Sequence, residues 1–381
     1  MRATLRVLVL LFCSSFARLV TIYNDRPRFD VEGKYVDAHD GNIVFHNGTF
    51  YLYGEFYGNL TGRPFNSDGG WGAAPQLSVY TSSDLTAWAF RGHLFNSSVP
   101  SGESFTKWIP TALWSPACGC FVLWFGSGGW AVATSIDGVN FDLRSNGGTS
   151  RLGGSTDGTG LFLDDDGQGY VVFAALSTGG ALNGGHLISI ERTTPDLLSS
   201  SKVNVSGFFP LDYVESPALF KRNGRYYVAS GSCCCACRGG SGLVIYSSDS
   251  ILGPWVLQRT GPLYDINCND QSTELCGAFG LRKVGAADIL WNAQWWSVST
   301  IPLAGGGSTL LLNGRRWLSG EGNDPACGDM CGNHGNNTPC DNPDYELRSD
   351  YDVWLPLEFD AAGNVLPLHA LPSFTLDIPD A

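Results

Sequence analysis

Three acidic residues stand at comparable places in a chain built largely from short apolar and aromatic segments. Asp40 comes just before NIVF, Asp157 just before GLFL, and Glu215 just before PALF. An ionised carboxyl can activate water as a general base, and a protonated carboxyl can release a leaving group as a general acid. Two carboxyls about 6.5–9.5 Å apart hydrolyse glycosidic bonds with inversion, and a third nearby carboxylate favours the protonated acid by charge repulsion. The three residues therefore predict acid–base hydrolysis of a glycoside.

Each of these residues also has a structural interpretation. Asp40 could be a turn residue, because aspartate is a poor strand former. Asp157, in STDGTG, could be a turn residue as well, and Glu215 could form a structural ion pair. Their shared placement favours catalysis, because neither interpretation explains why all three recur at similar points. His39 and Gly41 also give Asp40 a hydrogen-bond partner and room for close approach by a sugar.

The elements that must position these residues are strands that recur as a unit. Each unit has an apolar strand, a turn rich in glycine, asparagine or aspartate, an aromatic strand, and two further strands joined by a polar turn. The five units cover residues 42–92, 111–145, 159–201, 216–258 and 295–366. Five units of four strands predict an all-β, five-bladed β-propeller. A β-sandwich would explain the strands but not their recurring order.

The predicted propeller explains how distant residues could form one site. The innermost strand of each blade lines the central channel, and its start faces one mouth. Asp40, Asp157 and Glu215 each stand at or just before the first strand of a unit. We therefore expect three blades to present one carboxyl each to the same mouth.

Residues 1–20 have the features of a secretory signal peptide. Arg2 and Arg6 accompany an apolar run that is too short to span a bilayer, and small polar residues follow it. No later stretch is apolar enough for a membrane helix, and no linker divides residues 21–381, so we expect one secreted, monomeric domain. Sequons of the form N-x-[ST] agree with secretion; they begin at Asn47, Asn59, Asn96, Asn204 and Asn336.

The charge of the chain limits its partners. A net charge of −13 argues against nucleic acid and anionic membrane surfaces, because both are polyanions. A neutral oligo- or polysaccharide is not repelled by this charge. We therefore expect a carbohydrate partner, with no nucleic acid and no membrane.

The chain has 12 cysteines, and Cys13 falls in the predicted signal peptide. In a secreted chain we expect the others to form disulfides that mostly staple loops, and because their number is odd, one thiol stays free or forms an intermolecular bridge. The alternative is a metal site that includes the CCCAC segment at residues 233–237. Because the chain has the features of an exported protein, in which cysteines usually form disulfides, we expect neither a metal nor a cofactor.

At these carboxyls the chain resembles glycoside hydrolase family 43, whose members are five-bladed propeller glycosidases. The segment VESPALFKRNGRYYVASG is the most specific of the matching motifs. The resemblance implies that Asp40 is the general base, Asp157 modulates the pKa of the acid, and Glu215 is the general acid. It covers nearly the whole of residues 21–381.

Within that family the chain is most similar to the branch that contains exo-β-1,3-galactanases. The signs are AHDGNI, SPALFKRNGRYYV, LGPW and the late NGRRW with VWLPLEFDAAGN. In many of those enzymes glycine replaces the aspartate at Asp40, and a glutamine is implicated instead. Gln271 and Gln294 compete for that place, and Gln294 is preferred because it leads into a strand and has the better spacing to NGRRW.

The candidate substrate-binding residues are His39, Trp108, Gln294 and Trp317. Trp108 marks a departure, because KWIP stands where the branch commonly has an acidic or basic pair before a proline. We expect a contact with a sugar hydroxyl to be missing or to be replaced by stacking of Trp108. This departure bears on galactan specificity more than on catalysis.

These features predict a secreted, inverting glycoside hydrolase that acts on galactose- or arabinose-containing polysaccharides. The alternative is a carbohydrate-binding propeller that has lost activity, although such a protein would not need an acid, a base and a modulator. A retaining β-fructosidase is disfavoured because no NDPNG segment follows the predicted signal peptide.

Overall fold

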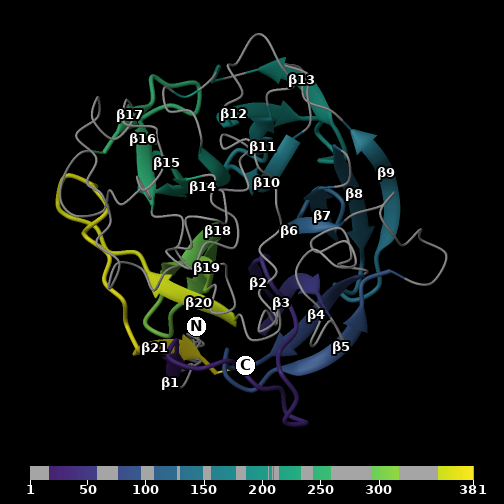
Figure 1. The fold of residues 1–381 in the computed structure, drawn as a ribbon, viewed down its shortest axis with the longest axis vertical. Helices are drawn as coiled ribbons and strands as arrows, with labels where there is room; N and C mark the ends of the chain where they lie inside the picture. The colour runs from purple at the N-terminus through teal and green to yellow at the C-terminus, as the bar shows by residue number, and fades with distance from the viewer. Residues whose placement is uncertain are drawn as a thin grey trace, which may run out of the picture.

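The protein is described by a computed structural model. It describes residues 17–57, 76–95, 107–126, 129–148, 156–176, 186–204, 206–207, 209, 214–232, 243–258, 293–316 and 351–380. The strands in these ranges form five sheets arranged around a central axis, together with one separate pair of strands (Figure 1). The prediction of an all-β, five-bladed propeller is confirmed.

Each blade is an antiparallel sheet whose strands follow one another in sequence order from the centre outwards. Blade 1 contains β2 (Ile43–His46), β3 (Thr49–Phe56), β4 (Gln76–Ser82) and β5 (Ala89–His93). Blade 2 contains β6 (Trp108–Ser115), β7 (Cys120–Gly126), β8 (Trp130–Ser135) and β9 (Asp142–Gly148).

The remaining blades continue the same order around the ring (Figure 1). Blade 3 contains β10 (Thr156–Leu163), β11 (Gly169–Leu176), β12 (His186–Thr193) and β13 (Ser200–Asn204). Blade 4 contains β14 (Val214–Arg222), β15 (Arg225–Ser232), β16 (Val244–Ser248) and β17 (Val256–Leu257). Blade 5 has three strands within the described ranges: β18 (Ala293–Pro302), β19 (Ser308–Arg316) and β20 (Tyr351–Pro356).

The predicted first hairpin forms as expected. Asn47 and Gly48 connect β2 to β3 with φ values of 48° and 78°, and His46 pairs with Thr49 across the turn. Two consecutive positive φ values define a tight turn whose twist matches the flanking strands. The turn sets the register of the strands that follow Asp40.

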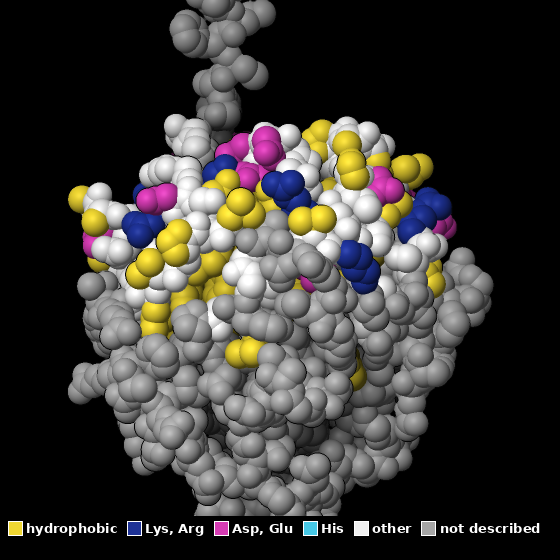
Figure 2. All heavy atoms as spheres, turned by 90° about the horizontal axis from the view of Figure 1, so that it is seen from above, with side chains coloured by type: hydrophobic (Ala, Val, Ile, Leu, Met, Phe, Trp, Pro, Cys, Tyr) yellow, Lys and Arg dark blue, Asp and Glu magenta, His cyan; other side chains and the backbone are white. Residues whose placement is uncertain are grey.

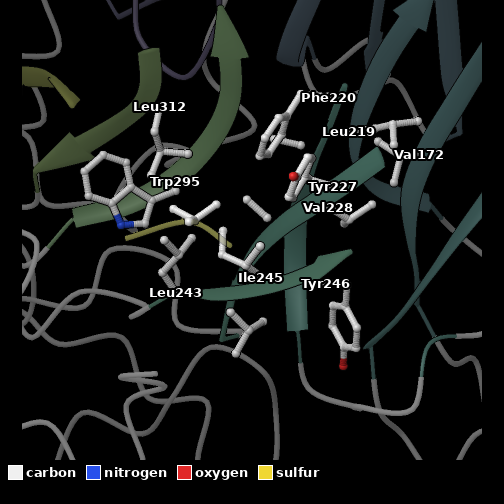
Figure 3. Packing of buried hydrophobic residues seen from close by; sticks show 14 of the residues in the cluster. Val172, Leu219, Phe220, Tyr227, Val228, Leu243, Ile245, Tyr246, Trp295 and Leu312 are labelled. Carbon is white, nitrogen blue, oxygen red and sulfur yellow. The ribbon is translucent and has the colours of Figure 1, made fainter. Parts of the chain in front are cut away.

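Blades pack against each other through both faces of their sheets. Every residue of β7 is buried, which explains its continuous apolar run in place of an alternating pattern. Between blades 4 and 5, Figure 3 shows Trp295 and Leu312 close to residues of β15 and β16, such as Val228 and Ile245. The stacked blades give the site a rigid surrounding.

The two ends of the described chain meet in the separate strand pair. β1 (Ala17–Tyr23) lies antiparallel to β21 (Ser373–Pro379), and Figure 1 places both near β20. Their apolar side chains pack with Trp88 of blade 1 and Trp354 of blade 5. The side chain of Asn24 adds a link, since it donates to Trp354 O (2.7 Å) and accepts from Trp354 N (3.0 Å). This pair therefore joins the first blade to the last.

The predicted signal peptide overlaps this arrangement. Residues 17–20 belong to β1, where they pair with residues 376–379, while residues 1–16 lie outside the described part of the chain. Among the described residues we find no helix that could serve as a membrane span. On the face drawn in Figure 2, the coloured side chains include acidic, basic and apolar groups close together.

Cys118 and Cys120 form a disulfide at the turn of the β6–β7 hairpin. The expectation of disulfides is confirmed for this pair. The other cysteines after the predicted signal peptide lie outside the described residues.

Candidate active site

Asp40 lies in a bulge at the start of the innermost strand of blade 1. His39 and Glu55 exchange backbone hydrogen bonds (2.9 and 2.6 Å), and Tyr53 N donates to Asn42 O (3.0 Å). The segment between these pairs therefore carries one extra residue on the Asp40 side. Asp40 has a φ of 61°, a left-handed conformation that aspartate tolerates better than most residues.

Neighbouring groups hold this bulge in place. A Cβ atom on Gly41 would lie 2.0 Å from Tyr53 O, so the close approach of the two strands requires glycine. Ser297 Oγ of blade 5 donates to Gly41 O (2.7 Å). Asn42 bonds both backbone groups of Ala112 in blade 2 (2.8 and 2.9 Å). The backbone beside Asp40 is thus fixed by two adjacent blades.

Similar bulges occur in the other blades. The register shifts between Trp108 and Thr111 in blade 2 and between Glu215 and Ala218 in blade 4. The residues that follow Trp108 and Glu215, Ile109 and Ser216, have φ values of 49° and 54°. Left-handed geometry is unfavourable for β-branched isoleucine, and such strain often accompanies functional sites.

The bulges refine the predicted equivalence of the carboxyls. Asp40 takes the left-handed position that Ile109 and Ser216 take in their blades. Glu215 is one residue earlier, at the position of His39, which is the last paired residue before the bulge. The two carboxyls therefore come from neighbouring positions of the same motif, not from the same position.

Asp40 forms a buried ion pair with Arg315 of β19. Arg315 Nη1 lies 2.8 Å from Asp40 Oδ2, and both side chains are fully buried. Tyr57 OH lies 3.0 Å from the same oxygen, and the guanidinium of Arg315 lies over the ring of Tyr57. Asp40 Oδ1 accepts no hydrogen bond from the residues that the structure describes. The cation stabilises the ionised carboxylate in this buried position.

Glu55 is a second buried carboxyl in this cluster. Its Oε1 accepts a hydrogen bond from Ile109 N (2.7 Å), and its Oε2 lies 2.8 Å from Tyr57 OH. Burial, and then repulsion by Asp40, raise the pKa of Glu55 well above its usual value. The sequence interpretation missed Glu55, Tyr57 and Arg315. The sequence did contain a signal for Glu55 and Tyr57. In the segment YGEFY they are two residues apart, which places them on the same side of an extended chain.

Glu215 is held by Gln294. The amide nitrogen Nε2 of Gln294 donates to Glu215 Oε1 at 2.7 Å, and both side chains are buried. Gln294 stands directly opposite Arg315 in the β18–β19 register, and such pairs point to the same face with Cβ atoms about 4.5–5.5 Å apart. One hairpin of blade 5 therefore contacts both Asp40 and Glu215 and brings them to the same end of the ring.

Other predicted site residues have different surroundings. Asp157 pairs with Ala174 at the start of β10, but its side chain lies outside the described part. Gln271 and Trp317 are also outside it. Trp108 is half-buried at the start of β6.

His39 is buried and is directed towards acidic neighbours. Its Nε2 lies 3.2 Å from Asp37 Oδ1, and its Nδ1 lies 3.9 Å from Asp352 Oδ1. The ring centroid lies 4.9 Å from that of Tyr57. In the described residues, no group of His, Cys, Asp and Glu side chains has the arrangement of a metal site.

A propeller that holds two buried carboxyls at one end of its ring defines a class of protein, the propeller-type glycosidases. A sequence model of glycosyl hydrolases family 43 matches residues 35–281. The chain belongs to glycosyl hydrolase family 43, a family of inverting O-glycosyl hydrolases. No curated protein has a sequence that matches this chain at a significant level.

Solved structures are similar over most of the chain. An exo-β-1,3-galactanase from Clostridium thermocellum has a TM-score of 0.68 and 19% identity, covering 94% of this chain and 67% of that one. The exo-β-1,3-galactanase from Phanerochaete chrysosporium with galactose has a TM-score of 0.65 and 19% identity, covering 94% and 69%. An endo-1,4-β-xylanase from Bacteroides thetaiotaomicron has a TM-score of 0.55 and 19% identity, covering 91% and 97%. At this level of identity the likeness supports the fold.

Proposed function

We propose that this protein hydrolyses β-galactosidic bonds of galactose-containing polysaccharides, with Asp40 as general base and Glu215 as general acid. The observation that carries the proposal is the β18–β19 hairpin, whose Arg315 contacts Asp40 and whose Gln294 contacts Glu215. An inverting hydrolase needs one ionised and one protonated carboxyl on opposite sides of the bond that breaks. The cation of Arg315 favours the ionised form of Asp40, and Gln294 contacts Glu215 without adding charge.

The proposed reaction uses the two carboxyls in one step. Arg315 and Tyr57 both approach Oδ2 of Asp40, which leaves Oδ1 to take the proton from water. The activated water attacks the anomeric carbon, and Glu215 gives its proton to the departing glycosidic oxygen. Asp157, at the start of the innermost strand of blade 3, is proposed to favour the protonated form of Glu215.

Gln294 is proposed to orient the acid, not to act as the base. A carboxamide cannot accept a proton from water at neutral pH, whereas a carboxylate can. Its Nε2 donates to Glu215 Oε1 at 2.7 Å, so it can fix the direction of the acid. This assignment separates the chain from galactanases that have glycine at the position of Asp40.

Galactose recognition is supported by the solved complexes of two similar proteins. One is the Phanerochaete chrysosporium enzyme with galactose. The other is a family 43 β-1,3-galactosidase with galactodeoxynojirimycin. Trp108, half-buried at the start of β6, is proposed to stack on a sugar ring, with His39 and Trp317 as further binding candidates.

The test is a substrate panel with purified protein: β-1,3-galactan, β-1,4-galactan, arabinan, xylan and the matching nitrophenyl glycosides. We expect galactose from a β-galactan, released first as the α-anomer in a proton NMR time course. Release of the β-anomer would contradict inversion, and activity confined to arabinan or xylan would contradict the sugar assignment. Binding of galactan without hydrolysis would favour the alternative of an inactive carbohydrate-binding propeller.

We also propose that the protein is secreted as a monomer. Asn47 is exposed at the tip of the β2–β3 hairpin, within the sequon Asn47-Gly48-Thr49. Because residues 17–20 belong to β1, we propose that the signal peptide is cleaved before Ala17 and not after residue 20. N-terminal sequencing of protein secreted from eukaryotic cells tests the cleavage site. A mobility shift after enzymatic deglycosylation that is smaller in Asn47→Gln than in wild type tests the glycan at Asn47.

A further inference from the structure

The hydroxyl group of Tyr57 is surrounded by three polar groups. It lies 2.6 Å from Arg315 Nη1, 2.8 Å from Glu55 Oε2 and 3.0 Å from Asp40 Oδ2. All four side chains are buried, with at most 1% of their surface exposed. Each of these contacts has the length of a hydrogen bond, so each requires a proton between the two atoms.

Counting protons limits how these contacts can be made. A tyrosine hydroxyl donates one hydrogen bond and accepts two, whereas a guanidinium only donates. Arg315 therefore uses one lone pair of the hydroxyl. Its single proton can then serve either Glu55 or Asp40, but not both. One of the two carboxyls must itself be the donor, and hence must carry a proton.

The surroundings decide which carboxyl carries it. Asp40 Oδ2 also lies 2.8 Å from Arg315 Nη1, and a cation at this distance favours the ionised form. The other oxygen of Glu55 accepts a hydrogen bond from a neutral backbone N–H, that of Ile109 (2.7 Å). The proton therefore resides on Glu55 Oε2. The bonds run from Glu55 to Tyr57 and from Tyr57 to Asp40.

Charge balance agrees with this assignment. With Glu55 neutral, Asp40 and Arg315 compensate each other within the buried cluster. An ionised Glu55 would place a second negative charge beside Asp40 in a buried cluster, which is costly. The pKa of Glu55 is accordingly raised, first by burial and then by Asp40.

We propose that Glu55 is a positioning residue that stays protonated during turnover and thereby directs the hydroxyl proton of Tyr57 onto Asp40. This inference rests on the proposed role of Asp40 as general base. Glu55 does not touch the reacting atoms in this assignment. It acts through Tyr57, which then donates to Asp40 Oδ2 and leaves Oδ1 for the water.

Other ionisable groups face the cluster. Asp352 of β20 lies near Asp40, and burial raises its pKa to about 6, while His39, Arg28 and Arg315 oppose that rise. His39 adjoins the ring of Tyr57. Because these groups can also affect the pH profile of activity, the profile of each variant must be compared with that of the wild type.

The decisive variant is Glu55→Gln, because a carboxamide copies a protonated carboxyl. Its nitrogen can donate to Tyr57 and its oxygen can accept from Ile109 N. We expect kcat/KM to fall by no more than about 5-fold, and the acidic limb of its pH profile, which reports the base of the free enzyme, to stay in place. If Glu55 were ionised, the substitution would remove a negative charge beside Asp40 and shift that limb downwards by about one pH unit or more. Such a shift would overturn the inference.

Tyr57→Phe removes the hydroxyl that joins Glu55 to Asp40. In contrast to Glu55→Gln, it should shift the acidic limb of the pH profile. Asp40 loses a donor to its ionised form, so the acidic limb should move to higher pH by about one unit. Tyr53→Phe is the matched control, since Tyr53 is a buried tyrosine of β3, the strand that ends just before Tyr57, and its hydroxyl donates to Gly138 O (2.8 Å). It should leave the acidic limb in place. An acidic limb that does not move in Tyr57→Phe would also overturn the inference.

A spectroscopic measurement separates this inference from the proposed function. A protonated carboxyl has an infrared carbonyl band that a carboxylate lacks. We expect the wild-type minus Glu55→Gln difference spectrum at neutral pH to show this band, and to show it again in an Asp40→Asn background. Absence of the band from the wild-type difference would contradict a protonated Glu55. Full activity of Asp40→Asn would instead contradict the assignment of the base, while the band would still decide the state of Glu55.

Discussion

Gln294 and Arg315 stand opposite each other in the β18–β19 hairpin, and each contacts a different carboxyl of the site. Gln294 donates to Glu215 at 2.7 Å, and Arg315 donates to Asp40 at 2.8 Å. Gln294 adds no charge beside Glu215, whereas the cation of Arg315 favours ionisation of Asp40. One strand pair can therefore give two carboxyls different protonation states.

Asp40→Asn should lower kcat by at least about 100-fold, because asparagine cannot accept a proton from water. It should also lower the melting temperature, since Arg315 would lose the counterion of a buried ion pair. Steady-state kinetics and thermal unfolding check both effects. Azide should restore part of the rate and give a glycosyl azide of inverted configuration, which separates lost chemistry from a damaged fold. Near-full activity would instead identify Asp40 as a turn residue, and Gln294 would become the group proposed to position the water.

Glu215→Gln should affect substrates according to their leaving groups. Hydrolysis of polysaccharide should be abolished, because a poor leaving group must be protonated as it departs. An activated aryl galactoside needs less protonation and should retain measurable turnover. The measurement is the ratio of kcat/KM for the two substrates in wild type and variant. An equal loss on both would count against the role of general acid.

Gln294→Glu should extend activity to higher pH. The substitution places a second carboxyl beside Glu215, at the position from which Gln294 Nε2 now donates to Glu215 Oε1 at 2.7 Å. A negative charge at this position would disfavour loss of the proton from Glu215. The basic limb of the pH profile should rise by about one unit. Gln294→Met is the control, because it removes the hydrogen bond without adding charge and should lower the rate with the limb in place. A basic limb that does not move in the glutamate variant would contradict the contact.

Asp352→Asn should stabilise the protein in a pH-dependent way. Burial raises the pKa of Asp352 from 3.8 to about 6, so the folded state binds more protons than the unfolded state between these values. Stability is therefore lost as pH rises from about 4 through 6, and the cost is constant above that. Asparagine avoids this cost, so the free energy of unfolding should increase by on the order of 2 kcal/mol at pH 8 and hardly change at pH 4. Urea unfolding at both pH values checks this, and an equal effect at the two would contradict it.

The sequence by itself determined the elements of this protein. The turn at Asn47 and Gly48, the apolar strands and the order of strands within each blade follow from local preferences and from neighbours along the chain. Because a blade consists of successive hairpins, its repeat can be recognised without knowing how the blades pack. This is why the five-bladed propeller could be predicted, together with Asp40 and Glu215 as its candidate carboxyls.

Only the tertiary structure decided how those carboxyls are held. Arg315 and Asp40 are separated by 275 positions, and Gln294 and Glu215 by 79, so their contacts exist only when the ring is closed. The one-residue offset between Asp40 and Glu215 depends on strand register at the bulges. Glu55 and Arg315 were overlooked because the sequence does not show whether a charged side chain is exposed to solvent or buried. Burial and partners, which come from packing between blades, decide which of these groups carries a proton.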